Sequence, residues 1–143
     1  MRVLMLGDAV GRPGRTALRN QLASLRLHKE LDLIIVNGEN SAGGVGITIK
    51  VMKELFDLDV DVITTGNHVW KNKEIYKQLD LEPRLLRPAN YPPGAPGTGI
   101  GVYQVKGLQL AVINLLGRHN LEDLDCPFRK ADELLTALPP ELN

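Results

Sequence analysis

Polar side chains able to bind metals or transfer protons stand directly behind short apolar runs of this sequence. An apolar run, a glycine and a polar residue follow one another in the segments that end in "LGD", "NGEN", "TGNH" and "LLGRH". Carboxylate, amide and imidazole groups form a ligand set suited to Mn, Fe or Zn, unlike a thiolate site. Two such metals about 3.5–4 Å apart can polarise a phosphoryl group and activate water. The candidate residues are Asp8, Glu39, Asn40, Asn67 and His68.

The same residue types are common in turns, where their side chains bond to the local backbone. Glu39–Asn40 and Asn67–His68 are nevertheless adjacent polar pairs where one turn residue would be enough, which favours a site. Arg12, in the segment "GRPGR", could meet a phosphate or be solvated, and both interpretations stay open. The chain lacks the GxGxxG and GxxxxGK[ST] patterns, so a nucleotide cofactor has no specific support.

The apolar runs are short and rich in Val, Ile and Leu, which is typical of strands covered on both faces. Amphipathic helical spacing lies between the first three runs, so the pattern predicts βαβ units and a parallel sheet. Ligands bind outside the carboxyl ends of such strands, where the candidate residues would share a crevice. The predicted strands lie in residues 2–8, 33–40, 61–68 and 110–119, and the helices in 15–28, 48–58 and 72–80.

The second half of the chain predicts different elements within the same single domain, residues 1–143. Two extended runs in residues 103–116 join at Lys106–Gly107 and indicate a hairpin. Residues 87–99 are dense in proline and glycine and predict a loop. Pro127 opens a final helix that closes before Pro139.

The composition narrows the classes of function. Lys plus Arg and Asp plus Glu both total 17, and this zero net charge argues against a stable nucleic-acid complex or an anionic membrane partner. The single cysteine, Cys126, cannot form an internal disulfide, which is consistent with a reducing, cytoplasmic setting. The longest apolar run falls short of the roughly 20 residues that span a bilayer. We expect a soluble cytoplasmic α/β protein.

Five segments together resemble the YmdB-like family of bacterial metallophosphoesterases, within the calcineurin-like phosphoesterase superfamily. They read "GDAVGRPGR", "NGENSAGG", "TGNHVW", "RPANYPPGAPGTG" and "PFRKADELL", and their order and spacing match over nearly the whole chain. The resemblance implies the N-terminal part of a calcineurin-like sandwich. It also implies two divalent transition metal ions (Fe, Mn or Zn) and small phosphodiester substrates such as 2',3'-cyclic nucleotides.

The resemblance assigns roles to the candidate residues. Asp8 would bind the first metal, Glu39 would bridge both metals, and Asn40 and Asn67 would complete parts of the first and second sites. His68 would donate a proton to the leaving oxygen, which suits a side chain that changes charge near neutral pH. Arg12 and Arg118 are the candidate substrate-binding residues.

The sequence departs from the family in its histidines. Family members supply three further metal-binding histidines from "HAE"-like and "GTHTHV"-like segments, and this chain has only His28, His68 and His119. We therefore expect either the N-terminal portion of a longer enzyme or a shortened variant, with an exposed strand edge that favours a homo-oligomer. The alternative function is a non-catalytic oligomerising or ligand-binding module that retains a half-site. A Rossmann-like nucleotide-binding domain is the third and weakest hypothesis.

Overall fold

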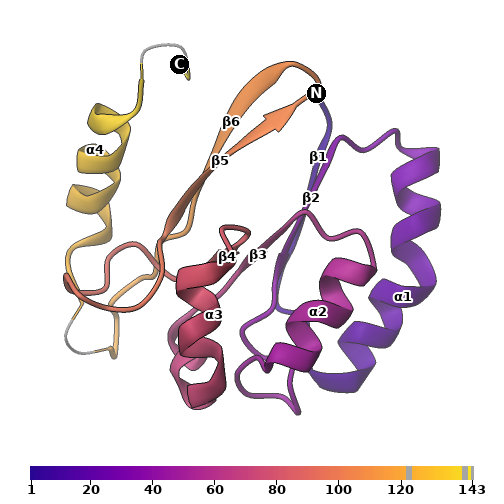
Figure 1. Ribbon diagram of the computed structural model, residues 1–143, viewed down its shortest axis with the longest axis horizontal. Coiled ribbons are helices and arrows are strands. Elements are labelled where there is room, and N and C mark those ends of the chain that lie inside the picture. The colour runs from indigo at the N-terminus through magenta and orange to yellow at the C-terminus, as the bar shows by residue number, and fades with distance from the viewer. Residues whose placement is uncertain (122–123, 140–141, 143) are drawn as a thin grey trace.

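Strands and helices alternate through the first half of the chain, and a hairpin and a last helix follow. The computed structural model describes residues 1–121, 124–139 and 142 (Figure 1). The strands are β1 (Val3–Leu6), β2 (Leu33–Asn37), β3 (Val62–Thr64), β4 (Leu85–Leu86), β5 (Ile100–Val105) and β6 (Leu108–Ile113). The helices are α1 (Gly11–His28), α2 (Ile49–Asp57), α3 (Tyr76–Leu81) and α4 (Pro127–Ala137), with 3-10 turns η1 (Asn67–Lys71) and η2 (Lys73–Ile75).

The first four strands form one parallel sheet in the order β1-β2-β3-β4. Val3 lies opposite Leu33, and Ile63 lies opposite Leu85, so chain order and sheet order are the same. Each crossover carries a helix, as parallel pairing requires. The predicted βαβ units are confirmed.

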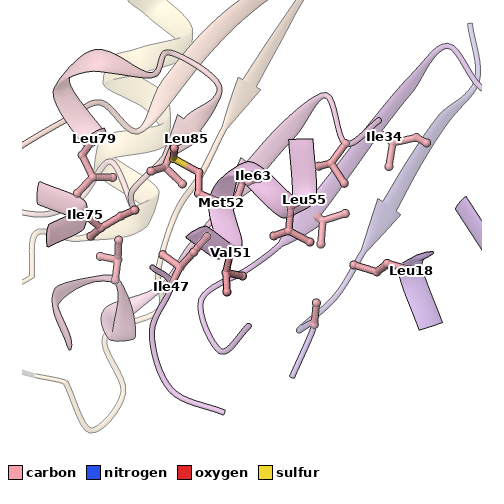
Figure 2. Close-up of a cluster of buried hydrophobic side chains, with 14 of the residues drawn as sticks. Leu18, Ile34, Ile47, Val51, Met52, Leu55, Ile63, Ile75, Leu79 and Leu85 are labelled. Carbon is pink, nitrogen blue, oxygen red and sulfur yellow. The ribbon is translucent and has the colours of Figure 1, made fainter. Parts of the chain in front are cut away.

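The helices α1, α2 and α3 cover one face of the parallel sheet (Figure 1). Alternate strand residues such as Ile34 and Ile63 point to this face and pack against Leu18 of α1 and Leu55 of α2 (Figure 2). The Thr48 side chain accepts a hydrogen bond from Val51 N at 3.2 Å, which caps the start of α2 as its sequence predicts. This face holds the larger of the two buried clusters.

The antiparallel hairpin of β5 and β6 packs against the opposite face of the parallel sheet. Leu33, Ile35, Val62 and Leu86 point to this side and form a second cluster with hairpin residues that include Val112. The predicted turn is confirmed, because Lys106 and Gly107 both have positive φ, as in a two-residue hairpin loop. Lys106 Nζ also lies 2.6 Å from Asp32 Oδ1, at the start of β2. This ion pair holds the turn beside the sheet.

Three sequence predictions need correction. The run in residues 110–119 contributes to β6 of the predicted hairpin, but among its residues only Val112 is buried, so it is not a strand covered on both faces. The parallel sheet also contains β4, a two-residue strand before the proline-rich loop that the sequence did not predict. Helix α1 begins at Gly11, four residues before the predicted start, and the predicted helix 72–80 is split between a 3-10 turn and α3.

Helix α4 lies apart from the parallel sheet, at the other side of the hairpin (Figure 1). Its first residue is Pro127, as the sequence predicts. All residues of α4 are described by the structure, and none of them is buried. Among the described residues, no helix has the length and apolarity needed to cross a membrane.

Candidate metal centre

The candidate residues follow the carboxyl ends of three neighbouring strands. Asp8 comes after β1, Glu39 and Asn40 come after β2, and Asn67 and His68 begin the turn after β3. Because the three strands are parallel and adjacent, their carboxyl ends share one edge of the sheet. The expected crevice is thus built from the ends of β1, β2 and β3.

Backbone hydrogen bonds continue the sheet pattern into the loops that carry these residues. Ala9 N donates to Asn37 O at 3.0 Å, and Gly38 N donates to Thr64 O at 2.9 Å. Thr65 N donates to Leu86 O at 3.0 Å, so β4 supports the β3 loop in the same way. The loops are therefore fixed to the sheet at the point where each polar side chain leaves it.

Asp8, Asn40 and His68 form a chain of side-chain hydrogen bonds. Asn40 Nδ2 donates to Asp8 Oδ2 at 2.8 Å, and Asn40 Oδ1 lies 2.6 Å from His68 Nδ1. An amide oxygen only accepts, so the proton of this second bond is on His68 Nδ1. Asp8 is exposed, His68 is half-buried, and Asn40, which joins them, is buried. This arrangement fixes the imidazole ring and leaves Nε2 as its second functional nitrogen.

Glu39 lies against the backbone of the β3 loop. His68 N makes a long 3.4 Å contact with Glu39 Oε2, and a Cβ atom at position 66 would lie 2.1 Å from that same oxygen. Gly66 is therefore required for the carboxylate to sit where it does. By contrast, nothing lies within 4 Å of a Cβ built on Gly7, the glycine before Asp8. The glycine of "TGNH" has a packing reason that the glycine of "LGD" lacks.

The remaining predicted residues lie in different parts of the structure. Asn67 is half-buried between Gly66 and His68, and its side chain makes no hydrogen bond to the part of the chain that the structure describes. Arg12 lies in the first turn of α1 and lines a pocket beside the sheet edge. Arg118 lines a different pocket, next to Cys126 at the start of α4. His119 is exposed in the loop after β6.

Two residues outside the predicted set also support the edge. The Tyr91 ring meets the Trp70 ring edge-on with centroids 5.1 Å apart, and burial together with the Glu39 charge raises the pKa of Tyr91. Asn114, after β6, donates to Thr65 O at 2.7 Å and to Leu86 O at 3.0 Å. The sequence around Asn114 does not predict this supporting role, because the two residues that Asn114 bonds to come from distant parts of the sequence.

The donor set fits part of a metal centre. Asp8 and Glu39 supply anionic oxygens, and Asn40 and Asn67 supply neutral amide oxygens, a mixture that divalent transition metals accept. Within residues 1–121, 124–139 and 142, no three or more of the His, Cys, Asp and Glu side chains are grouped so that they could hold a metal ion. The described residues would therefore supply only part of a metal site, through two carboxylates and two amides.

Helices cover one face of the parallel sheet, a strand pair covers the other, and polar side chains follow the carboxyl ends of the strands. This arrangement is a calcineurin-like phosphoesterase fold. Residues 4–142 match the family described as YmdB-like protein, and the chain belongs to this family. The resemblance drawn from the sequence segments is confirmed.

Relatives share this chain's sequence and fold over about half of their own length. A "2',3'-cyclic-nucleotide 2'-phosphodiesterase" of Bacillus subtilis (strain 168) is 47% identical over 94% of this chain and 51% of that protein. A hypothetical protein from Thermus thermophilus has a TM-score of 0.91 and 40% identity over 97% of this chain and 54% of that one. A novel phosphatase from Mycoplasma pneumoniae has a TM-score of 0.89 and 31% identity over 96% and 51%.

Proposed function

We propose that this chain carries part of the active site of a metal-dependent phosphodiesterase of the cytoplasm. Its substrates would be small phosphodiesters, with 2',3'-cyclic nucleotides as the main class. The observation that carries the proposal is the hydrogen-bonded series Asp8–Asn40–His68 at the carboxyl edge of the sheet. The name of the Bacillus subtilis relative supports the substrate class. A proton-transfer group bonded to a candidate metal ligand suits metal-assisted phosphodiester hydrolysis.

The metal ligands of the proposal are Asp8, Glu39, Asn40 and Asn67, for two divalent ions of Fe, Mn or Zn. When bound, such ions polarise the phosphoryl group and lower the pKa of water. The residues of this chain contribute two carboxylates and two neutral amides, which leave much of the positive charge uncompensated and favour an anionic substrate. Arg12 and Arg118 would add cationic contacts to the substrate, and Arg12 is the better supported because its helix begins beside Asn40: Gly11 N donates to Asn40 O at 2.9 Å.

His68 would protonate the oxygen that leaves phosphorus. Water forms a new P–O bond and gives up one proton to solvent, the bond from phosphorus to one ribose oxygen breaks, and that oxygen takes the proton of His68. Because Nδ1 donates to Asn40, the transferred proton is carried on Nε2, and the ring must be in its imidazolium form before the step. The bond to Asn40 keeps Nε2 in a fixed direction, which lowers the cost of orienting the acid.

Replacing His68 with Ala tests the proposal in the metal-loaded, full-length protein. Loss of a positioned general acid should lower kcat for a 2',3'-cyclic nucleotide by roughly 10²–10⁴-fold, with metal content unchanged. His28→Ala is the matched control, because His28 is exposed on α1 and, among the described residues, its side chain bonds only to Ser24 of its own helix. Turnover by His68→Ala equal to that of His28→Ala would overturn the role of His68.

A second candidate function is a non-catalytic module that associates through an apolar groove. The groove, about 310 Å³, lies between β1 and β6, and its lining includes Val3, Met5 and Leu110. Met5 is 73% exposed on the edge strand β1, and such an edge invites association. Metal analysis and a phosphodiesterase assay distinguish the candidates: two tightly bound metals with turnover support the enzyme, whereas a stable oligomer without either supports the module.

A further inference from the structure

A polar pocket of about 330 Å³ lies between α1 and α2, beside the candidate metal centre. Four cationic side chains and a single carboxylate line it, so the pocket carries an excess of positive charge in a protein whose net charge is zero. Helices α1 and α2 lie side by side on the same face of the sheet (Figure 1). The lining residues are Arg12, Arg15, Thr16, Arg19, Lys50 and Glu54.

Glu54 holds two of these cations in place. Arg15 Nε donates to one carboxylate oxygen of Glu54 at 3.0 Å, and Arg19 Nη2 donates to the other at 2.5 Å. The side chains of Arg15 and Glu54 are about four-fifths buried, so solvent screens this pair less than an exposed one. Among the described residues, Arg12 and Lys50 have no ion-pair partner. The pocket thus combines ordered guanidinium groups with two uncompensated cations, which is the arrangement that binds phosphate.

The pocket and the metal centre share the loop after β2. Arg15 Nη1 donates to Ser41 O, the residue directly after the candidate ligand Asn40. Gly11, directly before Arg12, donates its N–H to Asn40 O. The pocket residues therefore contact the backbone of the same loop that carries the candidate ligand Asn40.

We propose that this pocket binds a second phosphate of the substrate, attached at the 5' oxygen. The inference rests on the proposed function, because in a 2',3'-cyclic nucleotide the scissile phosphate occupies the 2' and 3' oxygens of the ribose and leaves only the 5' oxygen free to carry a second phosphate. The substrate class is then a 2',3'-cyclic nucleotide with phosphate on its 5' side. That phosphate is either a terminal 5'-phosphate or the internucleotide phosphate of a short RNA end.

The first test compares hydrolysis of adenosine 2',3'-cyclic phosphate with and without a 5'-phosphate by the metal-loaded, full-length protein. The 5'-phosphate should raise kcat/KM roughly ten-fold or more, the size expected of a charged hydrogen bond. Lys50→Ala should remove most of this gain and leave hydrolysis of the unphosphorylated substrate unchanged. Lys53→Ala is the matched control, because Lys53 is also on α2 but lines a neighbouring pocket and not this one, and the gain should persist.

A dinucleotide that ends in a 2',3'-cyclic phosphate separates the two phosphate sources. A gain equal to that of the 5'-phosphate assigns the pocket to internucleotide phosphates as well, whereas a gain confined to the terminal 5'-phosphate assigns it to the more highly charged group. Equal kcat/KM values for all three substrates would overturn the inference and leave the proposed function standing. If none of the three is hydrolysed, the proposed function fails and the inference fails with it.

Binding without metal gives a readout that does not depend on turnover. In the metal-free protein at low salt, adenosine 5'-monophosphate should bind more tightly than adenosine by calorimetry, and added salt should reduce the difference. Lys50→Ala should remove the difference, and Lys53→Ala should keep it. Equal affinity for adenosine and its 5'-monophosphate in the unaltered protein would count against the pocket.

Discussion

The two faces of the parallel sheet are covered to different extents. On the helix side, three helices bury residues of β2, β3 and β4 such as Ile34, Ile63 and Leu85 (Figure 2), and they partly bury Leu4 and Leu6 of β1. On the hairpin side, β5 and β6 cover β2, β3 and β4, and the β1 residues Val3 and Met5 stay exposed. Strand β2, in contrast, has four consecutive buried residues. The helix side of the sheet is covered across all four strands, whereas the hairpin side is covered over only part of its width.

This difference explains which residues of the candidate site are held in place by the packing of the sheet. The β2 and β3 loops, which carry Glu39, Asn40, Asn67 and His68, leave strands that are covered on both faces. Asp8 instead leaves the edge strand β1, and it is exposed. We infer that the positions of Glu39 and His68 depend on the packing of the sheet, whereas the position of Asp8 depends more on its own bond to Asn40.

The largest expected effect is on the free energy of unfolding, and it is measured by truncating one leucine on each side of the sheet. Leu55 on the helix side and Leu86 on the hairpin side are both fully buried, so truncation to Ala removes the same atoms. Leu55→Ala should lower the free energy of unfolding by about 4 kcal/mol, and Leu86→Ala by about 2–3 kcal/mol, since the two-stranded hairpin can close on its cavity more easily. Urea unfolding of both variants measures this, and equal losses would show that the hairpin is packed as rigidly as the helices.

A smaller effect is expected on the stability of the protein at alkaline pH, through a tyrosine on the hairpin side. Burial raises the pKa of Tyr103 from 10.0 to about 12, and its hydroxyl donates to Pro83 O at 2.9 Å. The folded state therefore holds this proton more tightly than the unfolded state. The resulting stability is complete below pH 10 and is lost as the pH rises toward 12.

Tyr103→Phe should remove this part of the alkaline slope in unfolding experiments across that range. Tyr76→Phe is the control on the helix side, because it deletes a hydroxyl that bonds to Trp70 O, and the slope should persist. An unchanged slope in Tyr103→Phe would mean that Tyr103 does not link the hairpin to pH.

The smallest expected effect is at the uncovered edge. Met5→Gln changes a side chain that is 73% exposed, so the free energy of unfolding should change by no more than about 0.5 kcal/mol at low protein concentration. Sedimentation of the same variant reports whether the groove beside β1 holds a second copy. A loss of several kcal/mol would show that this edge is covered in solution, which would contradict the difference between the two faces.

Local signals in the sequence predicted several elements because the interactions behind them are local. Thr48 caps α2 through a bond three residues away, and Lys106–Gly107 adopts a turn that favours positive φ. Strand β4 gave no such signal, because two residues are too few for a periodic pattern and are fixed by pairing with β3. The antiparallel hairpin could be predicted for the same local reason, since its turn lies between two extended runs of residues.

The sequence by itself determined the chemistry available at the sheet edge: a glycine and metal-binding or acid–base side chains behind each of three apolar runs. Only the tertiary structure decided which of them meet. Parallel pairing of β1, β2 and β3 brings Asp8, Asn40 and His68 into one series of hydrogen bonds, and Gly66 leaves room for the Glu39 carboxylate. The pocket between α1 and α2 likewise depends on two helices packed side by side. Residue types are local properties, whereas these contacts join positions roughly thirty residues apart, which only the packed sheet and its helices bring together.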